Sequence, residues 1–247
     1  MSDAWPFVWF DSIDSTSEEA KRRAQNGAVD PLWIAARDQT SGRGRRGRSW
    51  DSPRGSLYCT ALFNWDGPLV DLTRVPFASA LAAVDAIKSM VPDSDPKLKW
   101  PNDIRVNRAK LSGILVETGE ANNTRWVAAG IGINIGSAPK GVGQETTSLS
   151  ALRGDTLITA DIALDVLAEA FVRRLNEAKI DFRTTRADWL QHADGLGEDA
   201  QVKLDGQTIR GVFEGLAEDG ALILRLPDGE QRLITAGDVD LVRDVKV

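Results

Sequence analysis

The stretch Gly42-Arg43-Gly44-Arg45-Arg46-Gly47-Arg48 places three glycines and four arginines within seven residues of a chain whose formal net charge is −6. Glycine lets the backbone adopt positive φ and approach a ligand closely. Arginine adds a planar set of donors that matches phosphate and carboxylate oxygens. Because the stretch stands between two apolar segments, we interpret it as an anion-binding loop.

Two other interpretations of this arginine loop, residues 42–48, compete with that one. A cluster of charges can simply be a solvated surface turn. The glycines also fit the dinucleotide fingerprint G-x-G-x-x-G, but that motif requires a helix to begin inside it. Here Trp50-Asp51-Ser52-Pro53-Arg54-Gly55 follows, which is typical of turns. The dinucleotide interpretation is therefore excluded, and a phosphate loop is favoured over a plain turn.

The composition narrows the classes of function. The chain has 247 residues, 42% of them hydrophobic and 27% charged, which is ordinary for a soluble globular protein. Its length allows one large domain, or a large one with a small one. The acidic balance argues against a broad nucleic-acid-binding surface. A single cysteine, Cys59, excludes a disulfide framework, and its strand-like surroundings predict a buried thiol. With His192 the only histidine, chemistry based on positioning and electrostatics is favoured.

The sequence contains no secretory signal and no segment apolar enough to span a membrane, so we expect a cytoplasmic protein without membrane contact.

Local patterns predict the elements of the first 197 residues. Ser15 and Glu18 have the spacing of a capping box, so a helix should run from there to about Asn26, with Gly27 after its end. Thr159 is the expected N-cap of a later helix. The other expected helices are 72–90 and 189–195, the expected strands are 6–10, 32–36, 55–63, 104–106, 111–117 and 125–136, and 137–158 is expected to be a loop.

The last fifth of the chain changes character. Asp205-Gly206, Asp219-Gly220 and Asp228-Gly229 separate short alternating segments at 201–204, 209–216, 222–226 and 231–235. Repeated Asp-Gly between such segments is typical of hairpins. We therefore expect a small antiparallel barrel of SH3-like size, with domains at 1–197 and 198–247.

Polar residues lie just before two of the expected strands and inside a third. Pro101 turns the chain in Lys99-Trp100-Pro101-Asn102-Asp103, which leaves Asn102 and Asp103 at the turn. Lys110 opens the following strand, where it can face solvent or a buried anion. Asn134 is the one polar residue inside an apolar strand, so it is either hydrogen-bonded internally or part of a site.

These segments resemble, in order and approximate spacing, the signature blocks of biotin protein ligases. The matching segments are the arginine loop, 99–103, 110–117, 130–134, 195–197 and 236–239. The resemblance covers nearly the whole chain. It implies an α+β fold with a central mixed sheet and helices related to class II aminoacyl-tRNA synthetases, plus a C-terminal SH3-like domain.

The resemblance also implies an activity. These ligases use ATP to convert biotin to biotinyl-5′-AMP and then transfer biotin to a lysine of a biotin carboxyl carrier protein, usually a subunit of acetyl-CoA carboxylase. Mg²⁺ accompanies the ATP. A reactive mixed anhydride needs alignment, charge neutralisation and exclusion of water rather than a protein nucleophile.

The resemblance assigns site residues position by position. The biotin-binding residues would be Ser15, Thr16, Ser17, Gln39, Gly42, Arg43, Gly44, Arg45, Lys110 and Gly113. The ATP-binding residues would be Arg45, Arg48, Trp50, Asn102, Asp103 and Asn134. Arg45, Arg48 and Lys110 would neutralise charge, and the loop would close as a lid. Asp103 would lie near Mg²⁺ and either orient or deprotonate the acceptor lysine.

Two departures from the family pattern stand out. The usual Ser/Thr-Thr-Asn reads Ser15-Thr16-Ser17 here, so the contact of the asparagine amide with the biotin ring is lost unless a water substitutes. The matching region begins within the first dozen residues, so we expect no DNA-binding domain and no repressor function. An exposed edge of the central sheet would be compatible with a homodimer.

Three alternatives stay open at this point. Lipoate ligation shares the core fold and the adenylate strategy, although the arginine loop and residues 99–103 favour biotin. Octanoyl transfer is disfavoured because Cys59 lies in a strand pattern rather than a loop. A non-enzymatic nucleotide- or RNA-binding module could use the basic loop alone.

Overall fold

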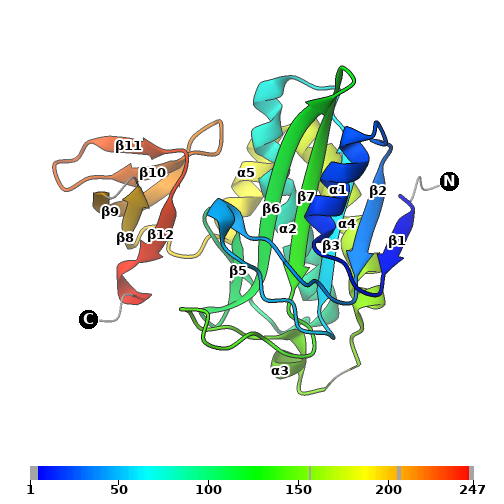
Figure 1. The fold of residues 1–247 in the computed structure, drawn as a ribbon. Helices are drawn as coiled ribbons and strands as arrows, with labels where there is room; N and C mark the ends of the chain where they lie inside the picture. Colours follow the sequence, from blue (N-terminus) through cyan, green and yellow to red (C-terminus); the bar gives the residue numbers. More distant parts are fainter. Residues whose placement is uncertain (1–4, 156, 205–206, 245–247) are drawn as a thin grey trace.

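Two sheets form the framework of the protein. The structure is a computed structural model that describes residues 5–155, 157–204 and 207–244. The larger sheet has seven strands in the order β1-β2-β3-β7-β6-β5-β4, and the smaller has five in the order β11-β10-β9-β8-β12. Figure 1 shows the small sheet beside the larger, helix-covered one. The expected mixed α+β architecture is confirmed.

The large sheet is mixed because one edge strand runs parallel to its neighbour. β1 pairs in parallel with β2, and the remaining pairs are antiparallel. β6 and β7 form a long hairpin whose turn residues Asn122 and Asn123 both have positive φ, as a tight hairpin turn requires. The strands are β1 (Phe7–Phe10), β2 (Leu32–Ala36), β3 (Leu57–Asn64), β4 (Lys97–Lys99), β5 (Asp103–Val106), β6 (Ala109–Ala121) and β7 (Thr124–Ile133).

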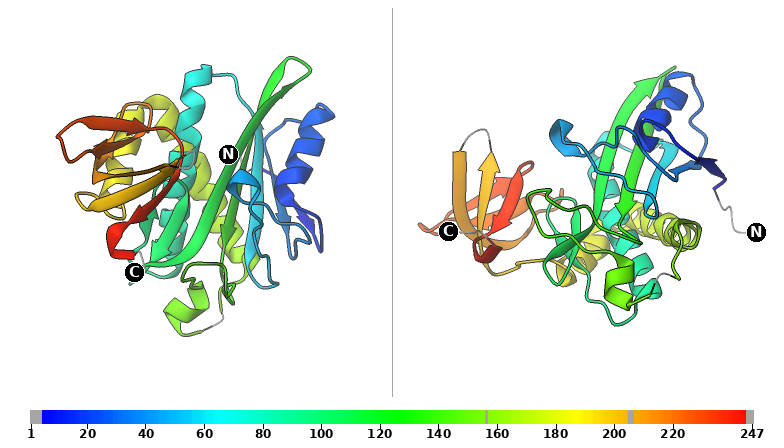
Figure 2. Two further views of the ribbon diagram at one scale, coloured as in Figure 1. Left: turned by 60° about the vertical axis from the view of Figure 1, so that its left-hand side comes forward. Right: turned by 60° about the horizontal axis from the view of Figure 1, so that its bottom comes forward.

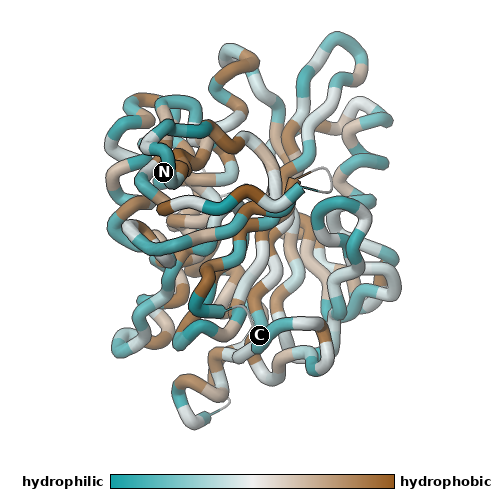
Figure 3. The backbone as a smooth tube through the Cα atoms, turned by 90° about the vertical axis from the view of Figure 1, so that its left-hand side faces the viewer, coloured by the Kyte–Doolittle hydropathy of each residue, from teal (hydrophilic) through white to brown (hydrophobic). Residues whose placement is uncertain are grey.

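Helices cover both faces of this sheet. Helix α1 lies on one face, and α2 and α4 pack on the other, with α5 against both of them; the left view of Figure 2 shows the sheet between them. In Figure 3 hydrophobic and hydrophilic segments alternate along the backbone, and hydrophilic ones are frequent in the outer loops. The helices are α1 (Thr16–Gln25), α2 (Val75–Met90), α3 (Leu149–Arg153), α4 (Ala160–Ile180) and α5 (Phe182–Gln191), with 3₁₀ turns at Arg45–Gly47, Leu69–Arg74 and Val242–Asp244. None of the helices in the described ranges is long and apolar enough to cross a membrane.

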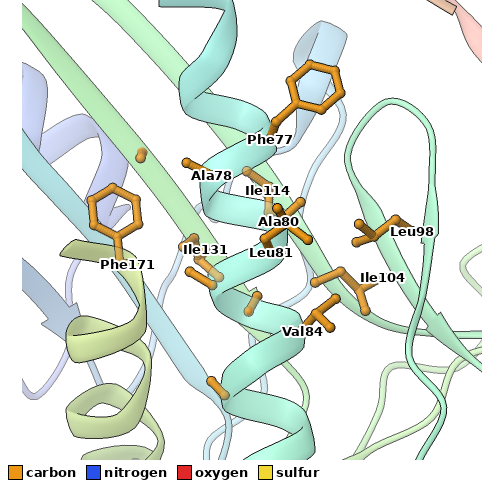
Figure 4. Packing of buried hydrophobic residues seen from close by; sticks show 14 of the residues in the cluster. Phe77, Ala78, Ala80, Leu81, Val84, Leu98, Ile104, Ile114, Ile131 and Phe171 are labelled. Carbon is orange, nitrogen blue, oxygen red and sulfur yellow. The ribbon is translucent and has the colours of Figure 1, made fainter. Parts of the chain in front are cut away.

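Side-chain alternation on β7 decides where a ligand can enter. Ala129, Ile131 and Ile133 belong to the main core against α2 and α4. Figure 4 shows part of this core, including Val84 of α2 beside Ile104. The alternate positions, Ala128, Gly130 and Gly132, face α1. Because two of them are glycines, Ser17 of α1 and the Trp50 indole can lie close against this face of the sheet.

Some local predictions need correction. Ser15 is the N-cap of α1, but its side chain makes no capping hydrogen bond, and Glu18 contacts Lys21 instead of closing a capping box. Thr159 does cap α4, because its hydroxyl accepts from the Ile162 amide at 3.3 Å. The predicted loop at 137–158 contains the short helix α3.

The small sheet carries one strand more than the four predicted segments. Its strands are β8 (Asp199–Leu204), β9 (Gln207–Leu216), β10 (Leu222–Arg225), β11 (Gln231–Ile234) and β12 (Asp238–Leu241). The Asp-Gly turns at Gly220 and Gly229 have the expected positive φ, whereas Asp205-Gly206 lies outside the described residues. Trp100 Nε1 donates to the Gly220 carbonyl at 3.3 Å, so the small sheet contacts the large domain directly. The boundary at 197/198 stays a prediction.

Candidate active site

A cavity of about 430 Å³ opens on the α1 face of the large sheet. Its walls come from the start of α1, the arginine loop, the strands β6 and β7, and the edge of the small sheet. All the predicted site residues except Gly42 line it: Ser15, Thr16, Ser17, Gln39, Arg43, Gly44, Arg45, Arg48, Trp50, Asn102, Asp103, Lys110, Gly113 and Asn134. Gly42 supports the loop from behind, since a Cβ there would lie 2.4 Å from the Trp50 carbonyl oxygen.

One end of the cavity is buried and uncharged. We call it the hydroxyl end, comprising Ser15, Thr16 and Ser17 of the first turn of α1 and the Gln39 side chain. The three hydroxyl residues are at most 6% exposed. Gln39 is held because its Oε1 accepts from the Thr16 amide at 2.8 Å and its Nε2 donates to Ser52 Oγ at 2.9 Å. This end is therefore a preformed set of hydrogen-bonding groups.

The opposite end is cationic. We call it the arginine end and include in it the four loop arginines Arg43, Arg45, Arg46 and Arg48, of which Arg46 alone does not line the cavity. Arg48 lies 2.7 Å from Asp238 of β12, Arg46 lies 3.5 Å from the same carboxylate, and Arg43 pairs with Glu18. Three of the four arginines thus contact a carboxylate from another element.

Arg45 differs from the other three arginines. It is half-buried, its Nη1 donates to Asn102 Oδ1 at 3.1 Å, and no carboxylate within the described ranges is close enough for an ion pair. Burial lowers the pKa of the Arg45 guanidinium. The guanidinium stays charged all the same, because arginine is not deprotonated in proteins. A partly desolvated cation without a counter-ion attracts an anionic ligand.

Lys110 and Trp50 lie between the two ends. Lys110 Nζ is 2.7 Å from Asp103 Oδ1, with both side chains mostly buried, and 5.0 Å from the centre of the Trp50 ring. The indole lies flat over Gly113 and Gly132, where an added Cβ would come within 2.6 and 2.8 Å of the ring. The two glycines thus make the space that the indole occupies.

Asn134 combines the two roles that its position in the strand allowed, an internal hydrogen bond and a place on the cavity wall. Its Nδ2 donates to the Thr147 carbonyl at 3.0 Å and to the Lys110 carbonyl at 3.4 Å. Its Oδ1 is buried and has no partner in the described part of the chain. Asn134 is therefore both anchored internally and left with a free acceptor at the cavity wall.

The far wall contains residues that the sequence did not identify. Lys99, Lys203, Asp238 and Asp240 line the cavity, and three of these come from the small sheet. Burial alone would raise the pKa of Asp240, but Lys99 at 3.3 Å and Lys203 at 3.2 Å hold it below its ordinary value. The sequence matches to family blocks covered Lys99, within 99–103, and Asp238, within 236–239, but not Lys203 or Asp240.

Two kinds of chemistry find little support here. Burial raises the pKa of the Cys59 thiol well above its ordinary value, so a thiolate nucleophile is disfavoured. Within residues 5–155, 157–204 and 207–244, no three His, Cys, Asp or Glu side chains converge as metal ligands. The arrangement suits binding of an anionic ligand next to a buried neutral group.

Comparison with known proteins places the chain in a family. The model of the biotin/lipoate A/B protein ligase family matches residues 9–134, and that of the biotin protein ligase C-terminal domain matches residues 195–242. A biotin–[acetyl-CoA-carboxylase] ligase of Paracoccus denitrificans is 37% identical over 92% of this chain and 96% of the relative. One of Mycobacterium tuberculosis is 30% identical over 91% and 85%.

A solved structure agrees with the sequence matches. The biotin protein ligase of Aquifex aeolicus, in complex with biotin and ATP, has a TM-score of 0.80 and 26% identity, over 96% of this chain and 98% of that one. The agreement extends over both sheets, because the aligned part spans nearly the whole chain. The chain belongs to the biotin protein ligase family.

Proposed function

We propose that this protein activates biotin with ATP and transfers the biotin to a lysine of a biotin carboxyl carrier domain, as a biotin–[acetyl-CoA-carboxylase] ligase. The observation that carries this proposal is the polarity of the cavity. A buried, uncharged hydroxyl end adjoins an arginine end, with Lys110 between them. The chemical groups of biotin and ATP follow a matching order: a neutral ring, a carboxylate and then the phosphates.

The binding of biotin follows from that polarity. The ring would lie at the hydroxyl end, against Ser15, Thr16, Ser17 and Gln39, where its polar groups replace water. Its carboxylate would then point toward Lys110, the cation nearest the middle of the cavity. Arg43, Gly44 and Gly113 complete the walls, and Gly42 holds the loop in shape.

The first step is an in-line displacement at phosphorus. A biotin carboxylate oxygen bonds to the α-phosphorus of ATP, the bond from that phosphorus to the bridging oxygen breaks, and pyrophosphate leaves. Arg45, Arg48 and Lys110 would neutralise the charge that develops on the phosphate oxygens. For Arg48 this means exchanging Asp238 for phosphate.

The nucleotide base needs a flat surface and a hydrogen-bond partner. The Trp50 indole offers the surface. The free Oδ1 of Asn134 can accept from the exocyclic amino group of adenine. Asn102 would act through Arg45, whose guanidinium donates to the Asn102 amide oxygen.

Transfer completes the reaction. The neutral amine of the acceptor lysine attacks the carbonyl carbon of biotinyl-5′-AMP, the bond to the phosphate oxygen breaks, AMP leaves and the nitrogen loses a proton. Asp103, next to Lys110, would orient that amine. The carboxylate also holds the Lys110 ammonium in place.

Mg²⁺ fits this site as a companion of ATP rather than as a resident ion. The Asp103 carboxylate is already paired with Lys110, and the cavity offers no cluster of three ligands among its described residues. Mg²⁺ commonly takes one or two carboxylates plus substrate phosphates. Asp103 would be the protein contribution, and the ion would supply further neutralisation of phosphate charge.

ATP–pyrophosphate exchange tests the proposal. Purified protein should catalyse exchange with biotin and not with lipoate or octanoate. Exchange that depends on lipoate would keep the chemistry and overturn the substrate. No exchange with any of the three acids, from folded protein, would refute the function. A filter-binding assay with RNA at moderate salt then tests the non-enzymatic alternative, which requires retention of RNA.

A further inference from the structure

A chain of hydroxyl groups runs behind the hydroxyl end of the cavity. Thr60 of β3 is fully buried and does not line the cavity. Its Oγ1 donates to Thr16 Oγ1 at 2.9 Å, and Ser17 Oγ lies 3.4 Å from it. Thr16 Oγ1 in turn donates to Gln39 Oε1 at 3.2 Å. Thr60 thus contacts two of the three hydroxyls that line the cavity, those of Thr16 and Ser17.

A group that can only donate determines which atom is the donor in each hydrogen bond of this series of hydroxyls. The Thr16 backbone amide can only donate, so the Gln39 atom 2.8 Å away must be the oxygen. The Gln39 amide nitrogen then donates to Ser52 Oγ, whose own proton goes to the Trp50 carbonyl at 3.2 Å. No rotation of the Gln39 amide is compatible with both contacts.

The Gln39 oxygen also determines the donors and acceptors among the hydroxyls next to the cavity. Thr16 has one hydroxyl proton, and the Gln39 oxygen takes it, so Thr16 must accept from Thr60. The proton of Thr60 is then used as well, and Ser17 must donate to Thr60. Ser17 and Thr16 are left with lone pairs and no proton for a ligand.

We propose that Thr60 is a positioning residue that makes the Thr16 and Ser17 hydroxyls acceptors of ligand N–H groups. The inference rests on the proposed function and deepens it. The ureido ring of biotin carries two N–H groups, whereas the dithiolane ring of lipoate carries none. Thr60 would therefore favour biotin over lipoate without touching either ligand.

The same arrangement gives Ser17 a specific task. An asparagine at this position would present a donor as well as an acceptor, but Ser17, held by Thr60, presents an acceptor only. Gly130 makes the arrangement possible, because a Cβ there would lie 2.8 Å from Ser17 Oγ and 3.5 Å from Thr60 Oγ1. Any larger residue would push Ser17 away from Thr60.

The test compares Thr60→Val with Thr60→Ser by calorimetric titration of two ligands. One ligand is biotin, and the other is its cyclic carbonate analogue, in which ring oxygens replace both N–H groups. Thr60→Val keeps the volume but frees the Ser17 proton, so the affinity for biotin should fall about tenfold. The analogue should bind better or unchanged, because Ser17 can now donate to its ring oxygen. Thr60→Ser keeps the hydroxyl and should leave the ratio of the two affinities within about twofold of the original.

The ratio of the affinity for biotin to the affinity for the carbonate analogue distinguishes a positioning role of Thr60 from a merely structural one. A merely structural loss would weaken both ligands equally, and an unchanged ratio in Thr60→Val overturns the inference. If that variant fails to fold, Thr60→Ala supplies the same test, because it also removes the hydroxyl and should lower the ratio. Absence of biotin binding by the unaltered protein would instead refute the proposed function.

Discussion

The hydroxyl end and the arginine end of the cavity are built in opposite ways. The hydroxyl end lies between α1 and the sheet, and its groups hydrogen-bond to one another with defined donors and acceptors. The arginine end lies on an exposed loop. Three of its four cations contact carboxylates from α1 and β12. One end is fixed by packing, and the other by pairs that can be exchanged.

This difference indicates how each end responds to its ligand. Buried donors and acceptors that are already oriented need no rearrangement when a ligand arrives. Exposed ion pairs contribute about 0–1 kcal/mol each, so a phosphate group can replace a carboxylate such as Asp238 at low cost. We therefore expect selectivity to come from the hydroxyl end and charge neutralisation from the arginine end.

The largest expected effect is at Arg45, the one of the four loop arginines that has no carboxylate partner among the described residues. Arg45→Ala should lower the rate of adenylate formation by about a hundredfold or more, since removal of one preorganised charge-stabilising donor commonly costs that much. Pyrophosphate exchange measures the rate, and circular dichroism should show an unchanged fold. Arg46→Ala is the matched control, because Arg46 belongs to the same loop but does not line the cavity. Equal activity of the two variants would remove the proposed distinction among the arginines.

A smaller effect is expected at the junction of the two ends. Lys110→Ala should weaken biotin and slow adenylation, each by about tenfold, because the carboxylate loses its cation. It should also lower the thermal stability, since Asp103 is left mostly buried and unpaired.

A second substitution separates these two consequences of Lys110→Ala. Adding Asp103→Asn should recover stability but not activity, as thermal unfolding and exchange assays would show. Lys97→Ala is the control, because Lys97 does not line the cavity. Full activity in the single variant would place Lys110 outside the reaction.

Local sequence patterns were sufficient for most of the fold. The glycine-rich loop, the helix beginning at Ser15 and the Asp-Gly turns depend on backbone preferences that neighbouring residues reveal. The predicted capping box failed because Glu18 and the Ser15 hydroxyl serve other contacts or face the cavity. Such competition between local and tertiary partners has no signature in the local sequence.

The site could be predicted only in part, for the same reason. Residues that carry a charge or an amide at strand ends, such as Lys110 and Asn134, were identifiable. Thr60 looked like any polar residue in a strand, since its importance depends on the direction of protons in a buried chain. Asp238 joins the site only because β12 pairs with β8 at the edge near the arginine loop.

The smallest expected effect is that of ionic strength, which should act differently on the hydroxyl end and the arginine end. Raising the salt from about 0.05 M to about 0.5 M shortens the Debye length and screens exposed charges more than buried ones. The KM for ATP should rise a few-fold, because phosphates meet Arg48 and its neighbours in partly exposed positions. The KM for biotin should change less, because its ring meets buried neutral groups. Steady-state exchange assays at each salt concentration measure both.

Asp238→Asn provides an internal control, because it removes the carboxylate that competes with phosphate for Arg48. In that variant the KM for ATP at low salt should be lower than in the unaltered protein. If the biotin KM instead tracks the salt as strongly as the ATP KM, the two ends do not differ in the way their burial implies.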